Sequence, residues 1–363
     1  MRGDLAGLTF GEFSAWLGAV IGHSERFHRA LYRQVAVEGR WAPLEIPLWR
    51  DESPDAARTL TGLAAAVQAP APDRHQHEDD PGIGRTVKVA SRLTDGQTVE
   101  SVLIPMKGGG HHTVCVSSQV GCKMGCQFCH TATMGLVRQL TAAEITGQLA
   151  AVRQATGTTA RNVVFMGMGE PLDNPDAVAR AVAILTSPEA HGLARRHVTI
   201  STVGRADILP RWRELGLTGV NLALSLTAAD DALRSELMPV NRLHSLAELK
   251  KAVAAVPIPK DRRILVSCVV IPGLTDGPGH TADLIAWLAG LPVLVNLIPF
   301  NPIPSRPWRA PTDDEVMAVR DRLDAAGIPV RLRLTKGDAV MAACGQLGDP
   351  AARRRRPLES VPR

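Results

Sequence analysis

Three cysteines within eight residues give this sequence its clearest chemical signal. Cys122, Cys126 and Cys129 are spaced four and then three positions apart, and they are half of the chain's six cysteines. Thiolates are the usual protein ligands of iron–sulfur clusters. Three thiolates hold three irons of a four-iron cube, which leaves the fourth iron open for a small molecule. The spacing therefore predicts a redox cluster with one open iron.

Zinc is the main alternative for the same residues, because three cysteines and a histidine form a common structural zinc site. His130 is present, but its place directly after Cys129 makes it a poor fourth ligand of the same tetrahedron. A disulfide with a spare thiol is a weaker alternative, because the N-terminus carries no secretory signal. We therefore expect a reducing, cytoplasmic location.

The composition bounds the kind of partner. The 363 residues carry a formal net charge of +5 and a pI of about 9.1, which fits a polyanion such as RNA without identifying one. The longest uncharged run, Leu284 to Ser305, is broken by prolines and asparagines, so we expect no membrane association.

Changes in residue pattern divide the chain into five parts. Apolar residues recur at helical spacing from Thr9 to Val37, and Thr9 with Glu12 predicts a capping box. A segment rich in proline, histidine and acidic residues follows, and then a hairpin around Asp95-Gly96. The predicted parts are a helical accessory domain at 1–68, a linker at 69–84, a β-hairpin at 85–107, a core at 108–347 and a basic tail at 348–363.

From Thr113 onward, short β-branched runs alternate with helical stretches. Such alternation predicts a parallel sheet with helical crossovers. Six units are too few for a closed eight-fold barrel, so we expect an α/β fold that is a six-unit partial barrel or a doubly wound sheet. The expected strands are 113–120, 162–167, 197–202, 219–226, 263–271, 293–299 and 329–334, and the expected helices are 141–156, 175–186, 206–215, 246–255, 280–289 and 312–326.

Polar and glycine residues follow the expected strands where each one ends. In parallel α/β folds, ligands bind at the C-terminal ends of the strands. We therefore expect these residues to gather with the cysteine triad at one edge of the sheet. They are Gly169 and Glu170 after the second strand, Ser201 on the third, Ser225, Leu226 and Thr227 at the fourth, and Asn301 after the sixth.

The triad spacing resembles that of the radical S-adenosylmethionine (SAM) superfamily. An ordered set of further motifs between Arg85 and Leu347 resembles the RlmN/Cfr family of RNA adenine methyltransferases. The motifs lie at Cys115–Cys122, Met166–Asn174, Val198–Thr202, Leu224–Leu226, Asn296–Pro302 and Ala342–Leu347. The resemblance implies a partial (β/α)6 radical SAM barrel with a small helical N-terminal accessory domain that binds RNA and a β-hairpin extension.

The resemblance also implies roles for individual residues. Cys122, Cys126 and Cys129 match the ligands of a [4Fe-4S] cluster. Cys344 matches a methyl-carrying cysteine, Cys115 a second cysteine that releases a protein–RNA adduct, and Glu100 a carboxylate that accepts a proton from the substrate base. The matches to SAM-contacting positions are Gly169, Glu170, Ser201, Ser225, Leu226, Thr227 and Asn301.

The implied reaction is methylation of C2 of an adenine in 23S rRNA, with tRNA as a further substrate. A methyl group passes from one SAM to the Cys344 thiolate, the nucleophilic form of a cysteine. A radical derived from a second SAM removes hydrogen from that methyl, and the resulting methylene radical adds to the base. Cys115 then attacks the Cys344 sulfur to release the product, and a disulfide remains. The implied partners are RNA and an electron donor such as a flavodoxin-type reductase system, and we expect a monomer.

Two departures from the family pattern leave alternatives open. Thr227 lies where the family often has histidine, and Cys268 is an additional thiol that strand packing explains better than reactivity. The nearest alternative reaction is methylation of C8, or methylation of an adenine in another RNA. A radical SAM enzyme that acts on a protein or a small molecule, and an RNA-binding protein with a structural metal, are the alternatives from other classes.

Overall fold

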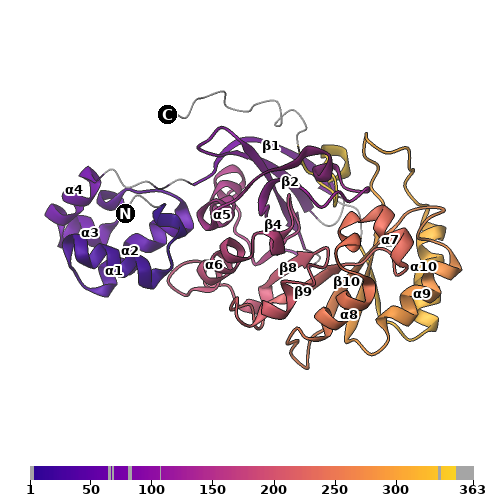
Figure 1. The fold of residues 1–363 in the computed structure, drawn as a ribbon. Helices are drawn as coiled ribbons and strands as arrows, with labels where there is room; N and C mark the ends of the chain where they lie inside the picture. The colour runs from indigo at the N-terminus through magenta and orange to yellow at the C-terminus, as the bar shows by residue number, and fades with distance from the viewer. Residues whose placement is uncertain are drawn as a thin grey trace, which may run out of the picture.

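The computed structural model describes residues 4–63, 67, 69–80, 84–106, 108–333 and 337–348. Its central feature is a ten-stranded sheet with the order β1-β2-β3-β4-β7-β8-β9-β10-β11-β12 (Figure 1). The seven strands from β4 to β12 are parallel, whereas β1, β2 and β3 are antiparallel. The parallel strands are β4 (His112–Cys115), β7 (Asn162–Phe165), β8 (Val198–Thr202), β9 (Asn221–Ser225), β10 (Ile264–Val270), β11 (Val293–Pro299) and β12 (Val330–Leu332).

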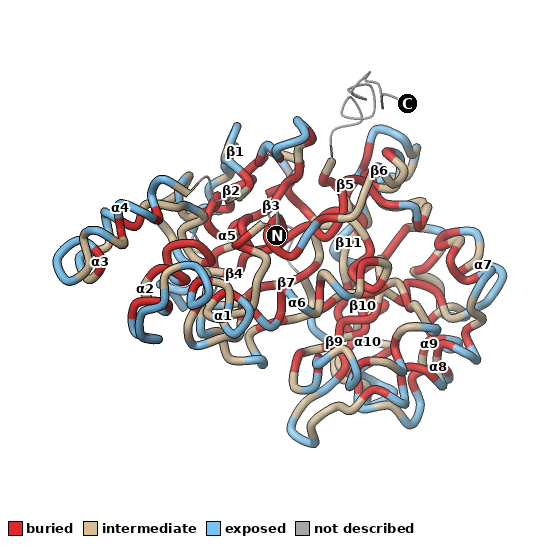
Figure 2. Tube along the Cα trace, turned by 60° about the vertical axis from the view of Figure 1, so that its left-hand side comes forward, coloured by how far each residue is buried: buried red, intermediate tan, exposed pale blue. Residues whose placement is uncertain are grey.

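Helical crossovers connect the parallel strands, as the sequence predicts. They are α5 (Ala142–Thr156), α6 (Pro175–Thr186), α7 (Asp231–Leu237), α8 (Leu246–Ala254), α9 (Pro278–Leu288) and α10 (Asp313–Ala325). The parallel strands from β4 to β11 consist of buried and half-buried residues, whereas β12 has no buried residue (Figure 2). Among the described residues, no helix is both long and apolar enough to cross a membrane.

The helix expected at 206–215 is wrong. This stretch contains only a short 3-10 helix, Leu209–Trp212, with turns on both sides. Pro210 provides the physical reason, because proline lacks the N–H that an α-helix interior requires. The short helix α7 was not expected from the sequence.

The N-terminal module forms four helices around an aromatic core. They are α1 (Phe10–Ile21), α2 (Glu25–Arg33), α3 (Pro47–Glu52) and α4 (Pro54–Gly62). The capping box of Thr9 and Glu12 is confirmed. Phe13, Trp49 and Leu60 are completely buried in this core. The module, which is the indigo part of the ribbon, lies beside α5 and α6 (Figure 1). An RNA-binding role for the module stays a prediction.

The expected linker is wrong for residues 71–80. These residues form strand β1 (Ala71–Asp80), which pairs antiparallel with β2 (Gly84–Arg92). An edge strand needs backbone pairing on one side only, and it tolerates proline and charged side chains. A linker-like composition is therefore compatible with this position. The expected hairpin is confirmed as β2 and β3 (Thr98–Pro105), and the basic tail beyond Gly348 lies outside the described residues.

The strand expected at 113–120 is two strands. After β4 the chain turns and forms β5 (Gln119–Cys122), which pairs with β6 (Gly135–Gln139) in a separate two-stranded sheet. Gly121 makes this pairing possible: its φ is +75°, and a Cβ there would lie 1.9 Å from the carbonyl oxygen of Gly135. Cys122 ends β5, and the loop between β5 and β6 carries Cys126 and Cys129.

Candidate active site

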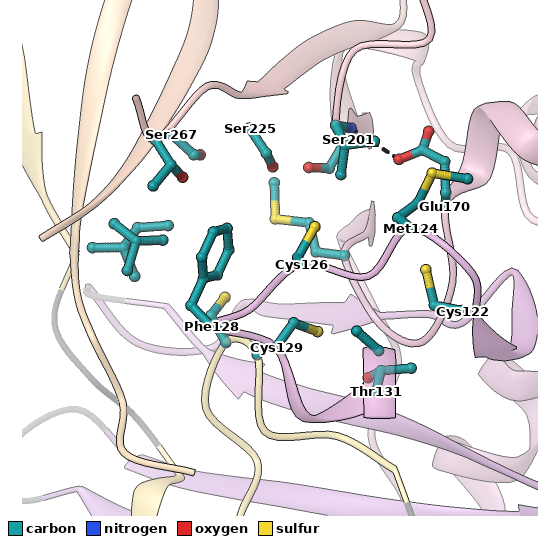
Figure 3. Close-up of a pocket in the computed structure, with 18 of the residues that line it drawn as sticks. Cys122, Met124, Cys126, Phe128, Cys129, Thr131, Glu170, Ser201, Ser225 and Ser267 are labelled. Atoms are coloured by element: carbon teal, nitrogen blue, oxygen red, sulfur yellow. Dashed lines mark hydrogen bonds between the residues drawn. The ribbon is translucent and has the colours of Figure 1, made fainter. Parts of the chain in front are cut away.

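The three cysteines of the triad line a single cavity, which we call the thiol cavity. Cys122 is the last residue of β5, and the backbone N–H of Cys129 donates to the carbonyl of Cys126 at 3.2 Å. Figure 3 shows the three sulfur atoms below the hydroxyl groups of Ser201, Ser225 and Ser267. The expectation that the triad and the strand ends meet at one edge is therefore confirmed for Ser201 and Ser225.

The triad fits a group that supplies positive charge. Burial raises the pKa of Cys122 to about 12, and it also raises the pKa of Cys126 and of Cys129. Three neighbouring thiols with raised pKa values do not ionise together unless a metal binds them. Among the described residues, no three His, Cys, Asp or Glu side chains are close enough to bind one metal ion. A four-iron cube gives each thiolate its own iron, so three thiols around one cavity fit a cube better than a single ion.

The zinc alternative would need His130 to join the triad. Instead, His130 lines a different cavity together with Lys88 and Glu100. We call this second space the Glu100 cavity. The histidine is buried, and its Nδ1 atom has no hydrogen-bond partner among the described residues.

Most of the predicted SAM-contacting residues line the thiol cavity. They are Gly169, Glu170, Ser201, Ser225, Thr227 and Asn301. The side chain of Leu226 does not line it, because the alternation along the extended chain turns Leu226 away from its neighbours and into the hydrophobic core. A SAM contact at Leu226 therefore stays a prediction, and it would not come from a side chain that lines this cavity.

Local backbone geometry shapes the wall opposite the triad. Gly169 has a φ of +101°, and a Cβ there would lie 2.6 Å from the Gln119 side chain, so only glycine fits. The Glu170 carboxylate accepts from the backbone N–H groups of Leu172 and Val203, each at 2.9 Å. Burial raises the pKa of Glu170 to about 7.

Thr227 adds a polar group that lacks a partner. Its φ of +58° is unusual for a β-branched residue, and its buried hydroxyl makes no hydrogen bond among the described residues. An unsatisfied buried hydroxyl costs free energy unless a ligand completes it. Thr227 and Glu170 thus fit the polar end of a small cationic ligand such as SAM.

Cys344 lies between the thiol cavity and a third space. Its segment is fixed by Asn301, whose side chain donates to the Cys344 carbonyl at 3.0 Å, and by the His130 N–H, which donates to the Gly345 carbonyl at 2.6 Å. Cys344 also lines the interior of the partial barrel, which we call the barrel cavity, and Cys115 lines the same cavity. The two cysteines that are distant in sequence are therefore brought together, and all six cysteines are free.

Glu100 lines neither of the two cavities that contain Cys344. Its Oε1 lies 3.5 Å from the Lys88 ammonium group, and its Oε2 accepts from the N–H of Gly348 at 2.8 Å. The side chains of Glu100 and Lys88 are each only 11% exposed. Met341, Gln346 and Gly348 line the Glu100 cavity, whereas Cys344 of the same segment lines the other two cavities.

Sequence reasoning missed two residues of this region. Ser267 lines the thiol cavity from β10, and the strand-end rule could have indicated it. Arg333 lines both the thiol cavity and the barrel cavity, and its charge opposes the burial that raises the pKa of Cys115 to about 12. No motif indicated Arg333. Cys268 is buried in the core, as strand packing requires.

Comparisons with known proteins agree with this geometry. Residues 116–285 match the model of the radical SAM superfamily. A dual-specificity RNA methyltransferase RlmN of Syntrophobacter fumaroxidans is 43% identical over 265 residues, which are 72% of this chain and 76% of that protein. The RlmN of Alkalilimnicola ehrlichii is 46% identical over 266 residues, which are 72% and 73% of the two chains.

A solved structure extends the similarity to nearly the whole chain. A radical SAM methyltransferase from Sphaerobacter thermophilus is 35% identical, with a TM-score of 0.83 that covers 94% of this chain and 98% of that one. The barrel and the cysteine triad define the protein as a radical SAM enzyme. The identity to the curated relatives goes further: the chain belongs to the RlmN/Cfr family of radical SAM RNA methyltransferases.

Proposed function

We propose that this protein methylates C2 of an adenine in 23S rRNA, with tRNA as a second substrate, and that Cys344 carries the methyl group. The observation that carries the proposal is the position of Cys344, which lines both the thiol cavity with the triad and the barrel cavity with Cys115. A methyl group on its sulfur would therefore be within reach both of the thiol cavity and of Cys115 in the barrel cavity. The flavodoxin-type electron donor and the monomeric state stay predictions.

In this proposal the triad would hold a [4Fe-4S] cluster, and Glu170, Thr227 and Asn301 would orient SAM beside it. When bound, the cluster and SAM supply a carbon-centred radical. Adenine C2 needs such chemistry, because it is an electron-poor carbon that does not attack a SAM methyl as a nucleophile. None of the residues that line the thiol cavity is exposed, which supports the proposal, since a radical must be kept from water.

The remaining steps fall to three side chains of this chain. Cys344 would take up the methyl group as a thiolate and present it to the base. Glu100 would accept the ring proton, which requires the Gly348–Glu100 hydrogen bond to open. Cys115 would attack the Cys344 sulfur and release the product. The target base would have to leave its stack to reach Cys344.

Mass spectrometry of RNA tests this assignment. The purified protein with its cluster is incubated with SAM, a reductant and bacterial 23S rRNA or tRNA, and the RNA is digested to nucleosides. We expect a product that co-elutes with 2-methyladenosine. Co-elution with 8-methyladenosine would correct the carbon, and deoxyadenosine production without any methylated adenine would refute the RNA assignment.

A further inference from the structure

The barrel cavity has a volume of about 610 Å³, within the range of ~300–1,000 Å³ that is usual for small-molecule sites. Inward-facing residues of the parallel strands, together with β3 and residues 342–347, form its walls. At one end lie the sulfurs of Cys115 and Cys344. At the other end lie Met106 and Arg196, which are exposed next to the N-terminal ends of β4 and β8.

Polar pairs line this cavity where a barrel usually has apolar layers. Bulky branched side chains normally fill the interior of such barrels. Here Thr113 is paired with Asn162, Thr199 with Asn221, and Asn296 with Arg331 across neighbouring strands. All six residues line the cavity. The alternation that directs them inward thus adds polar groups to a lining that also contains apolar side chains such as Val164, Leu265 and Ile298.

The barrel cavity is positively charged. Arg196, Arg331 and Arg333 line it, and no aspartate or glutamate is among its described lining residues. Arg331 is exposed, whereas Arg333 is close enough to Cys115 to favour its thiolate. A cavity with charge of one sign and low-dielectric walls concentrates small ions of the opposite sign.

We propose that the barrel cavity admits a small anionic thiol, which reduces the Cys115–Cys344 disulfide from the N-terminal side of the strands. The inference rests on the proposed function, because that turnover forms the disulfide. We call the end of the barrel cavity at Met106 and Arg196 its mouth. The mouth lies at the opposite end of the strands from Ser201, Ser225 and Asn301, where SAM is expected. The reductant therefore reaches the sulfurs without passing through the thiol cavity.

The reduction is a balanced thiol–disulfide exchange. The thiolate of a first small molecule attacks Cys115, forms a mixed disulfide and expels Cys344 as a thiolate. A second thiolate attacks the small molecule's sulfur and expels Cys115. Two small thiols thus become one disulfide, two electrons pass to the protein, and the two protons of the small thiols end on Cys115 and Cys344.

Alkylation of Cys115 tests access without RNA, SAM or turnover. The holoenzyme is treated anaerobically with iodoacetate or iodoacetamide, and the rate at Cys115 is followed by peptide mass spectrometry. The rate with iodoacetate is divided by the rate with iodoacetamide, and this ratio is compared with the same ratio for a free cysteine peptide, which corrects for the reagents' own reactivity. We expect a preference for the anionic reagent on the order of tenfold in low salt, falling as salt is added.

Charge reversal at the mouth should remove this preference. In a variant with both Arg196→Glu and Arg331→Glu, we expect the ratio at Cys115 to fall to or below that of the free peptide. The matched control is Arg213→Glu, an exposed arginine that does not line the cavity, which should behave as wild type. A wild-type ratio equal to that of the peptide, or a ratio that the double variant leaves unchanged, would overturn the proposal.

Three thiols of similar size test the reduction itself with the wild-type protein. They are 2-mercaptoethanesulfonate, 2-mercaptoethanol and cysteamine, which are anionic, neutral and cationic. After a single turnover, the disulfide should be reduced fastest by the sulfonate, once each rate is corrected for the thiol's reactivity toward a small disulfide. Equal corrected rates would contradict the proposal. If the alkylation preference holds but the single turnover yields no methyladenosine, the proposed function has failed and the anion-selective barrel cavity stands.

Discussion

The position of the Cys344 sulfur depends on the glycine that follows it. Gly345 has a φ of +83°, and a Cβ there would lie 3.0 Å from the carbonyl oxygen of Phe128, beside Cys129. Any other residue would be strained in conformation and would also press against the triad loop. Gly327 has a similar φ of +73°, but a Cβ there would have no atom within 4 Å. A substitution at Gly327 therefore tests the conformational strain without the steric contact.

Gly345→Ala should therefore reduce methylation far more than Gly327→Ala. We expect both substitutions to lower the free energy of unfolding by about 1 kcal/mol because of the positive φ. Only Gly345→Ala should lower the yield of methylated adenosine, by on the order of tenfold or more, because it displaces Cys344. Thermal unfolding and nucleoside mass spectrometry measure the two quantities. Equal product yields from the two variants would contradict the prediction.

Glu100→Gln separates the proton acceptor from the structural contact. The amide oxygen can still accept from the Gly348 N–H, but the side chain can no longer take up a proton. We expect product formation to fall by roughly 10²–10⁴-fold, the usual contribution of a general base, with the absorbance of the cluster unchanged. The matched control is Glu78→Gln, since Glu78 accepts from Ala339 in the same C-terminal segment. Full activity of Glu100→Gln would exclude Glu100 as the base.

Cys115→Ala should leave the RNA attached to the protein. Without the second thiol, nothing attacks the Cys344 sulfur, so the methylene-bridged adduct accumulates. A denaturing gel should show a slower band that is sensitive to ribonuclease. Cys268→Ala is the control, because Cys268 is also a buried strand thiol but lies outside the barrel cavity. An adduct in both variants, or in neither, would argue against a releasing role for Cys115.

At the level of elements, much of the fold could be predicted because it depends on local patterns. The β-branched runs and the turn signal Asp95-Gly96 indicated the strands of the large sheet from β2 onward but not β6, and the capping box of Thr9 and Glu12 indicated the start of α1. Strand β1 could not be found in this way, because its pairing with β2 needs no apolar side chains. Helix α7 has only seven residues, which is too short for a clear period.

The contact between the N-terminal module and the core predicts a dependence of stability on pH. The ring of His191 donates from Nε2 to the carbonyl of Ala36 at 3.2 Å, and desolvation lowers the pKa of His191 to about 4. The unfolded chain therefore binds a proton more readily than the folded chain, with a pKa near 6.5. This contribution to stability is present above pH 6.5 and is lost as the pH falls toward 4.

Thermal unfolding of wild type and His191→Gln between pH 7 and pH 4.5 measures this effect. The full pKa difference corresponds to roughly 3 kcal/mol, and we expect about 1–2 kcal/mol because the side chain keeps some contact with water. Glutamine can donate to Ala36 but does not titrate, so its stability curve should be flatter. Equal losses in the two proteins would rule out His191 as the source.

At the level of the whole molecule, three cavities meet at one short segment. Residues 341–348 contribute Cys344 to the thiol cavity and the barrel cavity, and they contribute Met341, Gln346 and Gly348 to the Glu100 cavity. The sequence indicated the residues of the thiol cavity because strand ends share an edge. It could not indicate that Glu100 lines a different cavity from the thiols, or that Arg333 is near Cys115, because both depend on how the C-terminal segment folds back.

The central claim is that Cys344 carries the methyl group, and the mass of its peptide tests this most directly. The holoenzyme is incubated with reductant and SAM that has a deuterated methyl group, before and after RNA is added. We expect the Cys344 peptide to gain one labelled group before RNA is added, and we expect that label then to appear in the methyladenosine. Labelled methyladenosine formed while Cys344 is never modified would contradict the account.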